Sequence, residues 1–234
     1  MKKAKKIDKI EKPKIDVVIC TPGHSVMAQY LTSLLETMAE LTNRKITWAL
    51  SIQYASMVTD AREMTANNGK ENDLANSLPF RGEFDYKKMF WIDSDIAWTP
   101  DDFMKLYESD KDIISGAYLL GNGDVTAYKK ELGEGYKYEE VKEMTEPVQI
   151  EGAGFGFICV KQGVFETLSR PWFGSIEVTK TMPDGTVYTF PVVGEDLSWC
   201  YKVRRKGFDI WFDPSVRVTH HKTVQLTWEG MKPL

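Results

Sequence analysis

The sequence predicts an α/β fold in which a mixed, mostly parallel central sheet is flanked by helices. Short apolar runs rich in β-branched residues alternate with helical patterns in the first half of the chain, which is typical of parallel strands joined by right-handed crossovers. Hairpin signals appear in the second half, so we expect antiparallel strands to join there. Of the 234 residues, 42% are hydrophobic and 12% aromatic, enough to bury the core of one domain.

Strands and helices alternate along the first half. Four short runs have the composition of buried strands: 15–20, 45–52, 87–93 and 112–119. An apolar stripe predicts a helix at 25–41, and a second helix is expected at 56–69, where Asn-Gly would end it. A third helix is expected after the third strand, with Thr99 as its N-cap and Pro100 at its first position.

The second half is more varied. Residues 121–147 are rich in Gly, Glu, Lys and Tyr without a clear period, so a mobile loop or a loose hairpin is expected. Residues 177–190 alternate around Asp184-Gly185, which predicts a hairpin. The other expected elements are a strand at 154–160, a short helix at 161–169, a helix at 196–207 that Gly207 ends, and a strand at 208–214.

Charge and cysteine content narrow the function classes. A net charge of −4 gives no global basic field for nucleic acid. A local patch could still bind one, and its residues are Lys202, Arg204, Arg205 and Lys206. The three cysteines lie far apart in apolar runs without a CxxC pair, so neither a disulfide framework nor a zinc knuckle is expected. A reducing cytoplasm is the simplest location.

The N-terminal segment does not resemble a targeting signal. No apolar run reaches the length of a membrane span, and MKKAKKIDKIEKPK lacks the apolar core of a signal peptide. Residues 1–14 are therefore expected to form a flexible basic tail, with contact to an anionic surface or a nucleic acid as the alternative.

Two acids directly follow the third predicted strand. The stretch MFWIDSDIAW places Asp93 and Asp95 two positions apart at the strand end, where both can point the same way. Ligands of open α/β sheets bind beyond the carboxyl ends of the strands. Two ionised carboxylates this close repel each other unless a cation intervenes, and oxygen ligands suit Mg²⁺ or Mn²⁺. The alternative is an N-cap followed by a solvated turn.

A second pair of acids stands at the start of the predicted helix at 196–207. Glu195 and Asp196 either complement the helix dipole or supply a carboxylate that deprotonates a hydroxyl nucleophile. Two histidines and Lys222 follow the last predicted strand in VTHHKT. Histidine can ligate Mn²⁺, and a lysine here could meet a phosphate.

Two further features allow both a structural and a functional interpretation. Arg62 either forms a surface salt bridge with Asp60 or Glu63, or contacts a phosphate or a base. The glycines of EGAGFGF (151–157) either pack closely or let the backbone approach a ligand. They are not a dinucleotide fingerprint, because no helix opens from them.

Taken in order, these stretches resemble the glycosyltransferases of the GT-A fold, a Rossmann-like nucleotide-diphospho-sugar transferase fold. The chain is similar to compact family-2-like enzymes of bacteriophages and giant viruses, related to fungal mannosyltransferases with an ARN…DxD pattern. The matching stretches cover most of residues 15–225: VVICTPG, TDARE, FWIDSDIAWTPDDF, DIISGAYL, EGAGFGFICVKQGVFETL and VGEDLSWCYKVRRKGFDIWFDPSVRVTHHKT. Glu63 stands where the family usually has the Asn of ARN.

The resemblance implies a UDP-sugar or GDP-sugar donor, a Mn²⁺ or Mg²⁺ ion and a hydroxyl acceptor, which could be a glycan, a protein or modified nucleic acid. It divides residues 15–234, taken as one domain, into a nucleotide-binding half at 15–120, the loop at 121–147 and an acceptor and catalytic half at 148–234. The location would be the cytoplasm, that of the host if the protein is viral. A homodimer is compatible with it.

The family's motifs also imply residue roles. Asp93, Asp95 and His220 would hold the metal, with His221 as the competing ligand. The residues expected around the nucleotide sugar are Thr21, Pro22, Arg62, Asp93, Ser94, Asp95, Gly154 and Lys222. Glu195 and Asp196 would bind the acceptor hydroxyl, and one of them would act as general base in a direct displacement.

Two other classes are the alternatives. A nucleotidyltransferase is expected to carry a Gly- and Arg-rich phosphate loop after its first strand, whereas TPGHSVMAQY contains one Gly and no Arg. A decayed, non-catalytic module that binds a sugar nucleotide or a carbohydrate is the second alternative. The intact acids and the late histidine argue against it.

Overall fold

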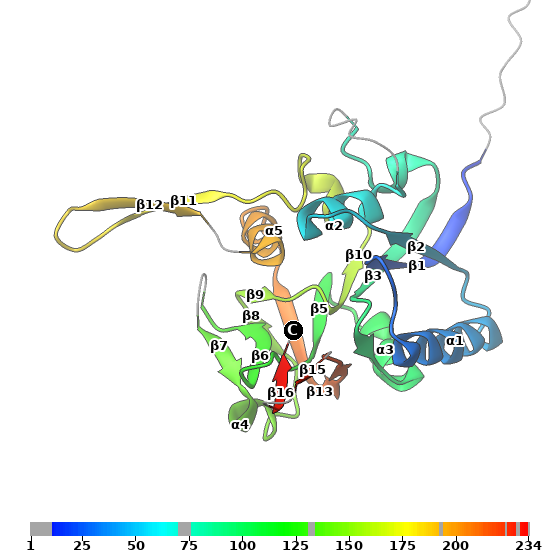
Figure 1. The fold of residues 1–234 in the computed structure, drawn as a ribbon. Helices are drawn as coiled ribbons and strands as arrows, with labels where there is room; N and C mark the ends of the chain where they lie inside the picture. Colours follow the sequence, from blue (N-terminus) through cyan, green and yellow to red (C-terminus); the bar gives the residue numbers. More distant parts are fainter. Residues whose placement is uncertain are drawn as a thin grey trace, which may run out of the picture.

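A seven-stranded sheet forms the centre of the computed structural model, which describes residues 11–69, 76–130, 134–191, 194–222, 224–227 and 230–233. The strand order is β2 (Trp48–Gln53), β1 (Lys14–Pro22), β3 (Asp85–Ile92), β10 (Phe157–Lys161), β5 (Ile113–Ala117), β13 (Ile210–Arg217) and β8 (Val148–Ile150) (Figure 1). β10 and β8 run against the other five strands. The predicted α/β fold with a mixed, mostly parallel sheet is therefore confirmed.

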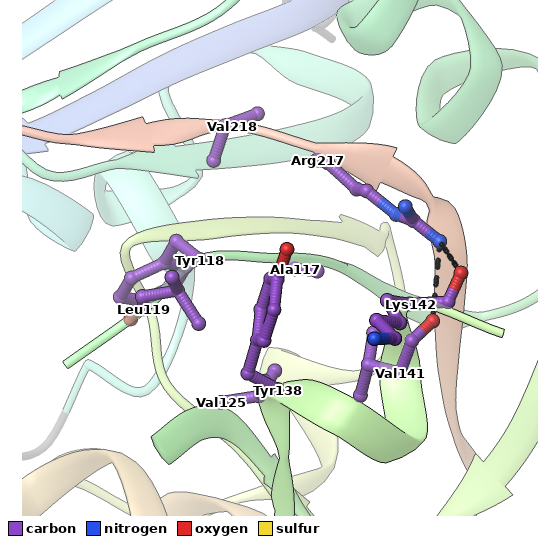
Figure 2. A pocket seen from close by; sticks show the side chains of 9 residues that line it. All are labelled: Ala117, Tyr118, Leu119, Val125, Tyr138, Val141, Lys142, Arg217 and Val218. Carbon is purple, nitrogen blue, oxygen red and sulfur yellow. Dashed lines mark hydrogen bonds between the residues drawn. The ribbon is translucent and has the colours of Figure 1, made fainter. Parts of the chain in front are cut away.

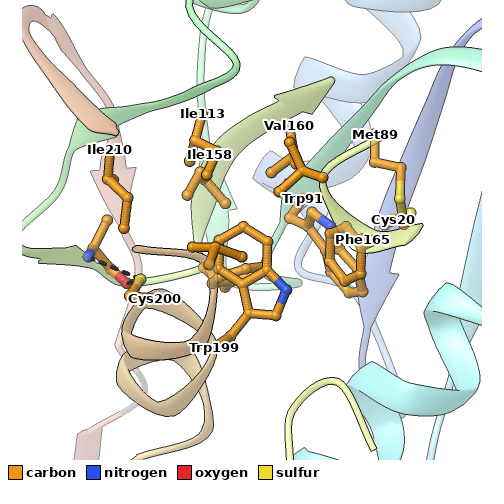
Figure 3. Packing of buried hydrophobic residues seen from close by; sticks show 14 of the residues in the cluster. Cys20, Met89, Trp91, Ile113, Ile158, Val160, Phe165, Trp199, Cys200 and Ile210 are labelled. Atoms are coloured by element: carbon orange, nitrogen blue, oxygen red, sulfur yellow. Dashed lines mark hydrogen bonds between the residues drawn. The ribbon is translucent and has the colours of Figure 1, made fainter. Parts of the chain in front are cut away.

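Helices cover both faces of this sheet (Figure 1). α1 (Ala28–Asn43) and α3 (Pro100–Glu108) pack on one face, and α2 (Val58–Ala66) and α5 (Glu195–Arg204) on the other. Alternate residues of each strand belong to the two resulting cores, because successive side chains point to opposite faces. In β1, for example, Val17 packs with the α1 and α3 core and Val18 with the other. Figure 3 shows Trp199 of α5 in the same cluster as Ile158, Val160 and Trp91, and its ring centroid lies 5.1 Å from that of Phe165.

The helix-end signals in the sequence act as expected. The Thr99 hydroxyl accepts a hydrogen bond from the Asp102 N–H (3.2 Å), and the Asp102 carboxylate accepts one from the Thr99 N–H (3.0 Å), which is a capping box. Gly207 follows α5 with φ +91°, a conformation that suits glycine at a helix end. The predicted short helix at 161–169 is wrong: only one turn forms, η2 (Phe165–Thr167), and Gly163 has φ +99°, which excludes an α-helix there.

The segment 121–147 carries regular structure. β6 (Asp124–Tyr128) and β7 (Gly135–Lys137) form an antiparallel hairpin, and α4 (Tyr138–Val141) follows it. β6 also pairs with β9 (Gly152–Ala153), so this segment is tied to the glycine-rich entry of β10. A hairpin is thus present, whereas its mobility stays a prediction.

Small antiparallel elements complete the fold. The hairpin predicted around Asp184-Gly185 is confirmed as β11 (Glu177–Thr181) and β12 (Val187–Pro191), and it projects away from the body (Figure 1). The other pairs are β4 (Ile96–Ala97) with β14 (Thr219–His220) and β15 (Val224–Thr227) with β16 (Gly230–Pro233). A 3₁₀ turn, η1 (Pro79–Gly82), precedes β3.

The basic tail and the cysteines were also the subject of predictions. Most of the predicted basic tail, residues 1–10, lies outside the described residues. All three cysteines are buried and unpaired. In the part of the chain that the structure describes, no helix has the length and apolar character needed to cross a membrane.

Candidate functional site

Four strands of the sheet end along one edge, and polar residues follow them. β1, β3, β5 and β13 all run in the same direction, so their carboxyl ends lie at the same end of the sheet. β10 runs the other way, so its glycine-rich entry reaches the same edge, where the Asp93 N–H donates to the Gly156 carbonyl (3.1 Å). The β4–β14 ladder pairs Ile96 with His220. It thereby joins the segment after β3 to the segment after β13.

Arg62 connects acids from two distant parts of the chain. Its Nε donates to Glu195 Oε1 at 2.9 Å, and its two terminal nitrogens donate to the Asp93 carboxylate at 3.1 and 3.4 Å. The Arg62 side chain is 4% exposed and its guanidinium lies 5.4 Å from the ring centroid of Phe155. Burial opposes its charge, but Asp93, Asp196 and Glu195 together raise its pKa. Arg62 is therefore a permanent buried cation at this edge, not a surface residue.

Asp196 lies in the same group of acids, but the hydrogen bonds of Arg62 go to Glu195 and Asp93. Its Oδ1 accepts a hydrogen bond from the Leu197 N–H at 2.8 Å. Burial raises the pKa of Asp196 to about 6, with Arg62 opposing the rise and Glu195 adding to it. Gly194, the N-cap of α5, has φ +88°, and a Cβ there would lie 2.9 Å from Asp196 Oδ1. Glycine thus lets the chain turn into α5 directly beside this carboxylate.

A second cluster surrounds Asp95. His220 Nε2 lies 3.1 Å and Lys222 Nζ 3.0 Å from the same carboxylate oxygen, Oδ2. His220 Nδ1 lies 2.7 Å from the Leu119 carbonyl oxygen, and its ring meets Tyr118 edge to face with centroids 5.4 Å apart. The hydrogen bond to Asp95 is the main cause that raises the pKa of His220. Both ring nitrogens face acceptors, so a metal ion could bind at Nε2 only in place of the proton that Nε2 shares with Asp95.

The competing histidine contacts Asp95 differently. The His221 backbone N–H donates to the Asp95 carbonyl at 2.8 Å. That bond fixes the chain without using the imidazole. Of the two histidines, His220 is the one whose ring meets the Asp95 carboxylate.

The predicted metal ligands are only partly brought together. Asp95 and His220 converge, whereas the Asp93 carboxylate is bonded to Arg62. Among the described residues, no three His, Cys, Asp or Glu side chains are grouped closely enough to hold a metal ion. A carboxylate oxygen and an imidazole nitrogen still suit Mn²⁺, and such ions usually complete their shell with water and substrate phosphates. The residues therefore fit a two-ligand site at Asp95 and His220.

The glycines before β10 are explained by Tyr118, a residue that the sequence did not single out. A Cβ on Gly154 would lie 2.3 Å from the Tyr118 hydroxyl, and one on Gly156 would lie 2.6 Å from Tyr118 Cζ. The hydroxyl accepts a hydrogen bond from the Gly156 N–H at 2.9 Å. Tyr118 directly follows β5, at the carboxyl end of a predicted strand, which is the signal that could have identified it. Gly154 thus serves packing in this structure.

The predicted contacts at the end of β1 lie at the same edge. Thr21 is buried, and its hydroxyl lies 2.5 Å from the Tyr30 hydroxyl, so its side chain is already bonded within the protein. Pro22 is buried beside it as the last residue of β1. Ser94 packs against Gly23, where a Cβ would lie 2.8 Å from the Ser94 hydroxyl oxygen. Of these residues, Ser94 is the one with a partly exposed side chain.

Glu63, which replaces the family's usual Asn, has a structural partner. Its carboxylate accepts hydrogen bonds from Arg170 Nε (3.2 Å) and from the Phe173 N–H (2.7 Å). The side chains of Glu63 and Arg170 are 7% and 1% exposed. Adjacent residues of α2 therefore have different roles. Arg62 donates to Asp93 and Glu195, and Glu63 binds the segment before β11.

An apolar cavity of about 120 Å³ lies next to the Asp95 cluster. Leu119 connects the two, because it lines the cavity and its carbonyl oxygen lies 2.7 Å from His220 Nδ1. Figure 2 shows Arg217 beside it, donating to the carbonyl oxygens of Val141 and Lys142 at 3.1 and 3.0 Å. The lining residues are Ala117, Tyr118, Leu119, Val125, Tyr138, Val141, Lys142, Arg217 and Val218.

Fold and site together define an α/β protein whose buried arginine, acids and histidine gather at the carboxyl edge of a mostly parallel sheet. No protein-family model matches the chain, and no curated protein matches it. Among solved structures it is similar to A197 from STIV, with a TM-score of 0.57 and 18% sequence identity. That match covers 94% of this chain and 93% of the other. At this identity the similarity shows a shared fold over nearly the whole length of both chains.

Proposed function

We propose that the protein is a metal-dependent glycosyltransferase of the GT-A fold, which moves a sugar from a UDP-sugar or GDP-sugar to a hydroxyl acceptor. The observation that carries this proposal is the pairing of two clusters at one sheet edge. One cluster holds Asp95 with His220, and the other holds Asp93, Glu195 and Asp196 around Arg62. The first suits a cation and a diphosphate, and the second supplies a base for a hydroxyl group.

Asp95 and His220 would hold the Mn²⁺ or Mg²⁺ ion. The ion would neutralise charge on the diphosphate leaving group. The chain adds its own charges, because Lys222 is half-exposed beside Asp95 and could bind a phosphate oxygen. Asp93 is held by Arg62 and would face the nucleoside side of the donor.

The nucleoside would lie over the ends of β1 and β2. The rings of His24 and Tyr54 meet there edge to face with centroids 4.8 Å apart, and Tyr54 is 53% exposed. Exposed aromatic rings of this kind can stack on a base. Neither residue was singled out from the sequence, since each stands alone in a loop.

Asp196 is the better base of the two acids at the start of α5. Glu195 Oε1 accepts the hydrogen bond from Arg62 Nε, so this oxygen already has a partner within the protein. The pKa of Asp196, raised to about 6 by burial, lies close to neutral pH, where a general base works best. Asp196 would take the acceptor proton while Arg62 and Glu195 hold the start of α5 in place.

A donor screen tests the proposal. The protein is incubated with UDP- and GDP-sugars and Mn²⁺, and release of UDP or GDP is measured with and without EDTA. Metal-dependent hydrolysis of at least one donor is expected. Donor binding without any release would favour the non-catalytic alternative, and the absence of both release and a Mn²⁺-dependent thermal shift with UDP or GDP would contradict the proposal.

Two substitutions test the assigned ligands. Asp95→Ala should abolish metal-dependent nucleotide binding and leave the fold intact, because the Asp95 carboxylate is partly exposed. His220→Ala should weaken Mn²⁺ binding by about tenfold or more, because loss of even an outer-shell partner of a metal ligand typically costs this much, whereas His221→Ala, the matched control, should change it little. The reverse order of the two histidine variants would reassign the ligand.

A further inference from the structure

We propose that Lys222 is a resident counter-ion of Asp95 and that a divalent cation displaces it. The freed ammonium then binds the diphosphate of the donor. This inference rests on the proposed function. The site would then exchange one cation for another as the metal and the donor arrive. This adds a coupling between metal and nucleotide binding that a fixed pair of ligands would not give.

The contacts of Asp95 place Lys222 where a metal would compete with it. Lys222 Nζ and His220 Nε2 approach the same oxygen, Oδ2, at 3.0 and 3.1 Å. A divalent ion bound between Asp95 and His220 would have to approach this oxygen too. Two cations on one carboxylate oxygen repel each other, so metal binding and the lysine contact oppose each other.

The two partners of Asp95 are held very differently. His220 is fixed by the β4–β14 ladder, by the Leu119 carbonyl and by the ring of Tyr118, and its side chain is 9% exposed. The Lys222 side chain is 54% exposed and lies beyond the end of β14. Displacement therefore falls on Lys222, while His220 stays in position as a ligand.

The released ammonium stays close to the proposed diphosphate position. Lys222 lies two residues after His220, and its flexible four-carbon stem allows Nζ to move from Asp95 to an adjacent phosphate oxygen. Without metal, the nucleotide must compete with Asp95 for this lysine. With metal bound, the lysine is already free, so metal binding should strengthen nucleotide binding and, by reciprocity, nucleotide should strengthen metal binding.

The test compares the wild-type protein with Lys222→Met, which keeps an unbranched side chain one atom shorter and removes its charge. Mn²⁺ binding is measured without nucleotide by the loss of the free-ion electron paramagnetic resonance signal. Loss of a partly exposed charge pair should tighten Mn²⁺ binding roughly two- to tenfold. Lys222→Arg, which keeps a cation, should restore the wild-type affinity.

The coupling is measured in a second step. The dissociation constant of UDP or GDP, whichever binds, is determined in EDTA and at saturating Mn²⁺, and the ratio of the two constants gives the coupling. The ratio should be smaller in Lys222→Met than in the wild type. Lys87→Met is a matched control, because Lys87 forms a similar exposed pair with Asp16 (2.6 Å) near the starts of β3 and β1, at the opposite end of these strands, and should change neither quantity.

The outcomes separate this inference from the proposed function. Equal Mn²⁺ affinities for the wild type and Lys222→Met would overturn the exchange and leave the transferase proposal standing if donor hydrolysis is present. Tighter Mn²⁺ binding in Lys222→Met with an unchanged coupling ratio would show that Lys222 only repels the metal ion. That result would overturn the proposal that the freed lysine binds the diphosphate. Absence of Mn²⁺ binding by either protein, with and without nucleotide, would overturn both.

Discussion

At the level of single residues, Arg62 determines how the acids of the site differ from one another. One buried guanidinium faces three carboxylates, and it bonds Asp93 and Glu195 but not Asp196. Removing water from acids costs free energy unless a cation or hydrogen bonds compensate it. Asp196 lacks a hydrogen bond from Arg62, and burial raises its pKa.

The raised pKa of Asp196 predicts the pH dependence of transfer. The deprotonated form is needed for a general base, so kcat should fall as the pH drops through about 6, the pKa of this group. Asp196→Asn should keep donor binding and lose transfer at every pH. Transfer that persists in Asp196→Asn, or a rate that is flat between pH 5 and 8 in the wild type, would contradict its role as the base.

The raised pKa of Asp196 also predicts that its contribution to stability falls as the pH rises, whereas transfer increases over the same range. Because the folded-state pKa lies above the ordinary value of 3.8, folding favours the protonated acid. That contribution is complete below about pH 4 and is lost as the pH rises through about 6. Asp196→Asn should therefore be more stable than the wild type at pH 8 by about 1–3 kcal/mol. The difference should vanish near pH 4, as thermal unfolding at both pH values would show.

At the level of elements, local patterns were sufficient for most strands of the central sheet and for the ends of two helices. The capping box at Thr99 and the glycine stop at Gly207 depend on neighbours in sequence, and both are present. The place of β10 between β3 and β5, and its reversed direction, depend on pairings between distant residues such as Cys159 with Phe90. No local period contains that information, so the sequence could predict a mixed sheet without giving its order.

The glycines before β10 leave room for the ring of Tyr118, which in turn contacts His220. Gly156→Ala would place a Cβ 2.6 Å from Tyr118 Cζ and push the tyrosine ring, which also contacts His220. Overpacking of this kind should destabilise the fold by about 1–3 kcal/mol. The displaced ring should also weaken Mn²⁺ binding at His220, as a metal titration would measure.

Gly121→Ala is the matched control for that substitution. A Cβ at Gly121 would meet nothing within 4 Å, so its unfolding free energy should change by less than about 0.5 kcal/mol. Mn²⁺ binding that is unchanged in Gly156→Ala, despite a lower melting temperature, would show that Tyr118 does not position His220. Equal stability of the two variants would contradict the close packing itself.

At the level of the whole molecule, the site joins segments from both halves of the chain. Asp95 and His220 are 125 residues apart, and Arg62 and Glu195 are 133 apart. Sequence reasoning could name these residues because acids and histidines after strands have recognisable chemistry. It could not pair Arg62 with Asp93 and Glu195, or show that Tyr118 packs against Gly154 and Gly156, since those contacts exist only once the sheet has assembled.

The hairpin of β11 and β12 projects from the body of the protein and exposes apolar side chains (Figure 1). It ends just before the segment that carries Glu195 and Asp196, and its outer part exposes Met182, Val187 and Tyr188 at 44%, 59% and 57%. A two-stranded hairpin with exposed apolar side chains is only marginally stable without a partner. Its position in the chain just before the proposed base suits a surface that contacts the acceptor.

A shortened hairpin separates acceptor contact from donor chemistry. Thr179 and Thr189 are directly opposite each other, so residues 180–188 can be replaced by Asn-Gly, which favours a two-residue turn. Donor hydrolysis and the melting temperature should stay at wild-type values, because the removed side chains are exposed. Transfer to any acceptor found in a glycan screen should fall by about tenfold in kcat/KM, which corresponds to roughly 1.4 kcal/mol of lost contact. Unchanged transfer would assign acceptor binding to another surface, whereas lost hydrolysis would show that the hairpin instead supports α5 and the acids at its start.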